Sequence, residues 1–124
     1  ETTAQKLIAM LDPDKNELDA EVLISALPIM PEDPAIVAKA EGWLKTSKDD
    51  EVAIKSFHYL AAHRGGEIAS KLGEIPVRNT GRFATVLKDF VGRRCPAQAE
   101  AVAEKLKDVG QPGQSPTLEG INCQ

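Results

Sequence analysis

Two histidines, His58 and His63, stand five residues apart in a stretch of helical sequence. Because each residue of an α-helix turns the chain by about 100°, side chains at this spacing point about 140° away from each other. They cannot bind one metal ion as the paired histidines of helical zinc sites do, since those are spaced four residues apart. We therefore interpret both histidines as surface or rim residues.

Asp12, Asp14 and Asn16 have the spacing of the first three ligands of a calcium-binding loop. Such a loop also needs a glycine at its sharp turn and a bidentate glutamate at its end. Glu17 and Leu23 occupy those two positions. We therefore interpret the segment as a solvated turn that caps the next helix.

Cys95 stands beside Arg93 and Arg94, just before an expected helix, where positive charge favours a reactive thiolate. No histidine with an orienting carboxylate accompanies it in the sequence. We interpret Cys95, and Cys123 in the tail, as incidental surface or packing cysteines. Two cysteines make neither a disulfide scaffold nor a CxxC motif, and they leave the compartment open. The sequence thus predicts no catalytic residues, no metal ligands and no cofactor.

Charge is unevenly distributed along the 124 residues, whose net charge is −4. The first third is acidic, whereas the segment from Arg78 to Arg94 is basic apart from Asp89. We expect this basic segment to contact an acidic protein or peptide, and a solvated helix face is the alternative. Exposed aromatic residues do not alternate with these charges, so a nucleic-acid partner is not expected. The candidate binding residues are Arg78, Arg82, Lys88, Arg93 and Arg94.

The composition predicts an all-α protein. Aromatic residues make up only 4% of the chain, while Ala, Leu, Lys and Glu, which lose little rotamer freedom in a helix, are plentiful. No run approaches the roughly 18 apolar residues of a membrane span, and no signal peptide is visible. We expect a soluble protein without a membrane partner, of unknown compartment and oligomeric state.

Helical periodicity places Asp33 at the N-cap of one helix and makes Gly65-Gly66 and Gly92 the ends of two others. The second helix is expected to bury one face made of Leu18, Val22, Leu23, Ala26 and Leu27. The expected helices cover residues 3–11, 18–27, 34–44, 51–64, 67–74, 80–91 and 96–109.

A weak internal repeat relates successive pairs of helices. Segments beginning at Ile36, Ile68 and Val102 can be superimposed, at offsets of about 33 residues. This pattern predicts stacked antiparallel helix pairs, as in a HEAT-like superhelix, or a compact bundle of six to seven helices. We expect one helical domain over residues 1–110 and an extended tail over 111–124.

The second half of the chain contains the segments SFHYLAAHRGGEIASKL, GRFATVLKDF, AQAEAVAEKL and TLEGIN. Their order resembles the closing helices of the C-terminal HEAT-like domain of gluzincin zinc aminopeptidases. The resemblance covers about half the chain and implies a non-catalytic region that supports or covers a peptidase site. None of that family's zinc ligands or catalytic residues has a counterpart in this chain.

The favoured function is therefore a non-enzymatic helical-repeat module that binds a protein or peptide. The first alternative is the non-catalytic C-terminal helical domain of a zinc aminopeptidase. The second is a helical bundle that binds a small ligand or a metal in its interior.

Overall fold

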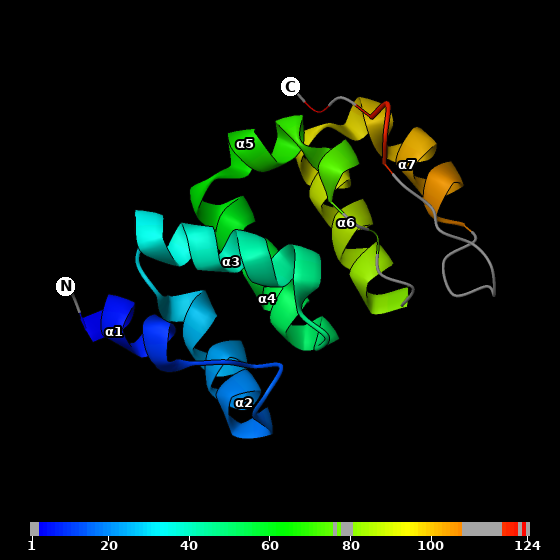
Figure 1. The fold of residues 1–124 in the computed structure, drawn as a ribbon. Coiled ribbons are helices and arrows are strands. Elements are labelled where there is room, and N and C mark those ends of the chain that lie inside the picture. The colour runs from blue at the N-terminus through cyan, green and yellow to red at the C-terminus, as the bar shows by residue number, and fades with distance from the viewer. Residues whose placement is uncertain (1–2, 76, 78–80, 108–117, 122, 124) are drawn as a thin grey trace. The chain divides into compact units, whose positions relative to one another are not determined.

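A computed structural model of the chain describes residues 3–75, 77, 81–107, 118–121 and 123 (Figure 1). These residues form seven α-helices and three short 3-10 turns, and none of them lies in a β-strand. The prediction of an all-α protein is thus confirmed. The expected domain boundary at residues 110 and 111 lies outside the described residues. So do Asn79, Thr80 and Gly110, which the helical pattern of the sequence predicts as helix caps.

The chain divides into two compact units, Glu1–Arg64 and Gly65–Gln124, which we call unit 1 and unit 2. Unit 1 contains α1 (Thr3–Met10), α2 (Glu17–Ala26), the 3-10 turn η1 (Leu27–Ile29), α3 (Pro34–Thr46) and α4 (Asp50–His63). Unit 2 contains α5 (Gly65–Ser70), the turn η2 (Leu72–Glu74), α6 (Gly81–Arg94), the turn η3 (Pro96–Gln98) and α7 (Ala99–Leu106).

The core of unit 1 is the pair formed by α3 and α4, which lie side by side (Figure 1). Ile36, Ala40 and Leu44 recur every fourth residue on α3 and are fully buried, so they form a single stripe. Phe57 of α4 is a large side chain that is also buried in this core. Helix α1 packs on α3, and α2 with η1 packs on α4.

Carboxylates fix the starts of both core helices. Asp33 accepts hydrogen bonds from the backbone N–H groups of Ala35 and Ile36, so the predicted N-cap of α3 is confirmed. Asp49 does the same at the start of α4. Each cap satisfies two of the N–H groups that have no partner within the helix.

Tyr59 fastens the loop that leads into α3. Its side chain is buried, its hydroxyl donates to the carbonyl oxygen of Pro31 at 2.8 Å, and it accepts from the N–H of Asp33 at 3.2 Å. Arg64 and Glu32 form an ion pair in the same region. Burial raises the pKa of the Tyr59 phenol above its ordinary value, although its hydrogen bond with Asp33 opposes this rise.

We expect Tyr59→Phe to lower the free energy of unfolding by about 1–3 kcal/mol at pH 7, because two part-buried backbone groups lose their partner. Since the folded protein keeps the phenol proton to higher pH than the unfolded chain, this contribution is complete below about pH 10 and is lost as pH rises through the raised pKa. Urea unfolding followed by the fluorescence of Trp43, the only tryptophan, measures both effects in unit 1. An unchanged midpoint in the variant at pH 7 would contradict this role.

Unit 2 departs from the sequence expectations at its glycines and at its last helix. Gly65 and Gly66 begin α5 instead of only ending the helix before them, and α5 ends at Ser70. Gly92 does not end α6, which continues to Arg94 because the hydrogen bonding is maintained up to Cys95. Pro96 opens a 3-10 turn, and the α-helix itself begins at Ala99.

The core of unit 2 is formed by a stripe on α6 and by the helix that follows. Phe83, Leu87 and Val91 recur every fourth residue and are buried, together with Val102 and Leu106 of α7. Helices α6 and α7 are in contact. Leu118, in the chain's last segment, is also fully buried.

A disulfide bond joins Cys95 to Cys123, with their Cα atoms 5.3 Å apart. The interpretation of both as incidental cysteines was therefore wrong. Leu118 and Cys123 are buried, and Ile121 N–H donates to Leu118 O at 3.0 Å across a turn in which Gly120 has φ +90°. The side chains of Leu118 and Cys123 are therefore packed away from solvent, and glycine suits the left-handed backbone at residue 120.

We expect reduction of the disulfide, or Cys95→Ala with Cys123→Ala, to lower the free energy of unfolding of unit 2 by about 3–4 kcal/mol. Loop-closure entropy of a loop this long sets that scale. Hydrogen exchange should accelerate in α6 and α7, whereas the exchange of α3 and α4 provides an internal control. Equal exchange rates in the oxidised and reduced proteins would contradict a stabilising role.

Candidate functional site

The predicted basic residues of α6 are exposed but do not share one face. Arg78 lies outside the described residues. Arg82 and Arg93 are three helical turns apart, and so point the same way about 16 Å from each other. Asp89 lies between them and accepts a hydrogen bond from Arg93 Nε at 3.2 Å. A carboxylate therefore interrupts the basic face.

The other two basic residues diverge from this line. Lys88 and Arg94 point about 120° to either side of Arg82. The Arg94 guanidinium lies over the start of α5, where a Cβ on Gly65 would stand 3.1 Å from Nη1. The described basic residues thus surround α6, and only Arg82 and Arg93 are brought to one face.

The acidic turn before α2 is used for structure. Asn16 accepts from the N–H of Leu18 at 2.9 Å and caps α2, as predicted from the sequence. Asp14 Oδ1 accepts from Ser47 Oγ at 3.1 Å and from the N–H of Lys48 at 2.8 Å, which ties the turn to the α3–α4 linker. Within the described part of the chain, no three His, Cys, Asp or Glu side chains are grouped to hold a metal ion.

The two histidines project from α4 into solvent. His63 packs its ring on Tyr59, with centroids 4.7 Å apart. His63 thus contacts the residue that fastens the loop before α3.

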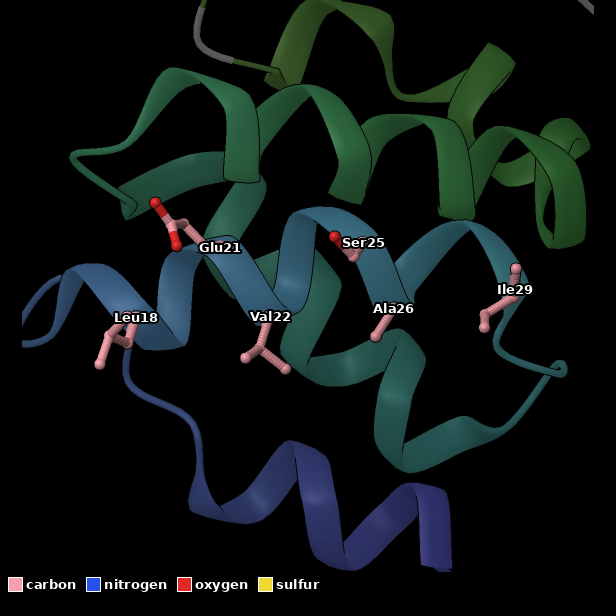
Figure 2. A pocket seen from close by; sticks show the side chains of 6 residues that line it. All are labelled: Leu18, Glu21, Val22, Ser25, Ala26 and Ile29. Carbon is pink, nitrogen blue, oxygen red and sulfur yellow. The ribbon is translucent and has the colours of Figure 1, made fainter.

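The most distinctive surface of unit 1 is the outward face of α2 and η1. Large apolar side chains are exposed there, at 69% for Leu18, 41% for Val22 and 84% for Ile29. Figure 2 shows these three and Ala26 projecting from one side of the helix. A shallow hollow of about 660 Å³ opens among them, lined by Leu18, Glu21, Val22, Ser25, Ala26 and Ile29.

Two apolar faces on one helix explain this surface. Ala20, Leu23 and Leu27 are buried, and the turn and helix that carry them pack on α4. At about 100° per residue, Leu18 lies about 140° from Leu23, so the two cannot share a buried face. The sequence-based grouping of Leu18 and Val22 with Leu23 and Leu27 was therefore wrong. A helix that is apolar on opposite sides is typical of one buried on both.

The residues that line the hollow suit binding through apolar contacts. Ser25 and Glu21 are the only polar side chains among the six lining residues. No histidine or lysine lines the hollow with Ser25, so this set lacks the usual base that activates a serine nucleophile. The hollow also opens broadly to solvent, unlike the enclosed pockets that bury most of a small ligand.

Comparison with known proteins adds no relative: no family model, curated protein or solved structure matches the chain. Among the described residues, no helix has the length and apolar character required to cross a lipid bilayer.

We expect Asp14→Ala to lower the free energy of unfolding of unit 1 by about 2 kcal/mol. The buried hydroxyl of Ser47 and the N–H of Lys48 would both lose a charged acceptor. The single substitution Lys15→Ala, which removes an exposed ion pair with Asp12 in the same turn, is the matched control and should change stability by less than about 1 kcal/mol. Chemical denaturation measures the free energy of unfolding of both variants. Equal losses would contradict the role of Asp14 in holding the turn to the α3–α4 linker.

Proposed function

We propose that this chain is a non-catalytic helical module that binds a protein or peptide on the outward face of α2. The observation that carries the proposal is the exposed apolar row of Leu18, Val22 and Ile29 around one hollow. Single exposed apolar residues are ordinary on protein surfaces, but a contiguous group rimmed by polar residues is typical of an interaction site.

The physical gain on binding comes from removing this row from water. Full burial of a Leu, Val or Ile side chain contributes about 1.5–3 kcal/mol relative to exposure. Two such side chains on α2 and one on η1 therefore give a partner a sizeable apolar anchor. Because α2 is held by its other face, the row is presented without refolding, which lowers the entropy lost on binding.

A second surface, on α6, supports a different partner. Arg82 and Arg93 point the same way and would attract an acidic protein or peptide. Asp89 reduces the positive charge between them, so we place this surface second. Stacking of the helix pairs into a HEAT-like repeat remains part of the proposal for either surface.

The resemblance of the second half of the chain to the C-terminal helical domain of zinc aminopeptidases supports a further alternative, in which this chain is a non-catalytic region of a longer protein that supports or covers a peptidase site. Mass spectrometry of the protein isolated from its source would decide this. A native mass of 13.4 kDa, the mass of this chain, would exclude the alternative.

The proposed function predicts where a bound partner can be trapped. Benzoylphenylalanine placed at Val22 should form a discrete photo-crosslink with a protein or peptide of the source cells, identifiable by mass spectrometry. Ile29→Asp should reduce the yield about tenfold, the scale of one apolar anchor.

Met10 provides the matched control, because it is exposed and apolar but does not line the hollow. A probe at Met10 should give no such product, and Met10→Asp should not change the yield from Val22. Crosslinking only from a probe at Arg82 would contradict the α2 surface in favour of α6. Circular dichroism checks that each variant keeps its helicity.

A further inference from the structure

The charges beside the outward face of α2 are all negative along the helix itself. Glu17, Asp19 and Glu21 are the charged residues of α2, and it contains no lysine or arginine. At about 100° per residue, Glu17 and Glu21 flank the apolar row on one side and Asp19 on the other. The apolar row thus lies between acidic edges.

The three carboxylates of α2 differ in whether a hydrogen bond holds them in place. Asp19 accepts a hydrogen bond from the N–H of Asp12 at 2.9 Å, so it is held in place. Glu17 and Glu21 are exposed, and Glu21 lines the hollow. Helix-dipole stabilisation explains acids in the first turn, but Glu21 lies beyond that turn. Its position leaves a carboxylate at the rim of the apolar surface.

The length of the row fits one helix. Leu18 of α2 and Ile29 of η1 are eleven residues apart, which at the rises of an α-helix and a 3-10 helix corresponds to about 18 Å. A partner helix of about 11–14 residues spans this length and can place apolar side chains at i, i+4, i+7 and i+11 against it. The shallow hollow between Val22 and Ile29 accepts such side chains without a deep pocket.

A second copy of this chain fits poorly. In a two-fold contact the same patch meets itself, so α2 of both copies brings only negative charge to the interface. Like charges brought together at an interface are unfavourable. An anionic lipid surface would be repelled for the same reason. A partner with positive charges beside its apolar stripe would instead be attracted by the carboxylates of α2.

We propose that the occupant of this face is a short amphipathic helix whose apolar stripe is flanked by lysine or arginine. This inference rests on the proposed function of the α2 face and adds the chemistry of the partner. The apolar stripe would provide affinity, and the basic flanks would pair with Glu17 and Glu21 and select against acidic helices.

The test uses three synthetic 14-residue peptides with the same leucine stripe and with flanks of lysine, glutamine or glutamate. Fluorescence anisotropy of the labelled peptides measures affinity for the full chain. The lysine peptide should bind about tenfold more tightly than the glutamine peptide, and the glutamate peptide should bind most weakly. This difference should shrink several-fold in about 1 M salt, where the Debye length is about 3 Å.

Two variants separate charge from apolar contact. Glu17→Gln with Glu21→Gln should remove the preference for lysine while the glutamine peptide binds as before. Glu100→Gln, in an exposed position on α7, is the matched control and should preserve the preference. Leu18→Ser should weaken all three peptides about tenfold.

Equal affinity for the three peptides, still weakened by Leu18→Ser, would overturn the basic partner and leave the proposed function intact. Affinities that Leu18→Ser does not change would count against the α2 face itself. Three further outcomes would each overturn the basic helix as the occupant. The first is that none of the three peptides binds, and the second is a concentration-dependent dimerisation in sedimentation that Leu18→Ser abolishes. The third is binding only to phosphatidylglycerol-containing vesicles.

Discussion

The packing of α2 against α4 is the constraint from which the surface of unit 1 follows. Leu23 and Leu27 enter the core together with Ala20, and this choice fixes the rotation of the whole helix. Once that rotation is fixed, Leu18 and Val22 must point outward, because side chains follow the helical period. The exposed row is therefore the other side of a well-buried helix and requires no local distortion of the backbone.

The surroundings of α2 hold that rotation from both ends. Asn16 caps its start, and Asp14 connects the same turn to the linker between α3 and α4. After its end, η1 leads to the loop that Tyr59 fastens through Pro31 and Asp33. Polar groups that resemble a metal loop in the sequence thus serve to position an apolar surface. A surface built on such fixed elements can bind without first becoming ordered.

Much of the architecture could be predicted from residue patterns. The turn that caps α2 and the cap at Asp33 depend on local chemistry, so the sequence predicted them correctly. Gly92 was misjudged because the weak preference of glycine against helix is overcome by the packing of the residue before it, Val91. The pairing of Cys95 with Cys123 depends on the path of the last segment, which periodicity does not describe.

The candidate site was missed for a related reason. The sequence shows that α2 is apolar on two sides, but which side is buried depends on how α4 is placed. Grouping Leu18 with Leu23 concealed the second face, although their spacing already separates them. The basic segment was the predicted binding surface because its charge is visible in the sequence. The dispersal of these charges around α6 follows from the helical period once the bounds of that helix are known.

The central claim is that the outward face of α2 binds an amphipathic helix while its inner face stays in the core. The most direct measurement is methyl NMR of the full chain, labelled at leucine, valine and isoleucine, during titration with the lysine-flanked peptide. The account predicts large shift changes at Leu18, Val22 and Ile29, and much smaller ones at the buried Leu23 and Leu27. Changes centred on Leu87 and Val91 of α6, or none at the three exposed side chains, would contradict it.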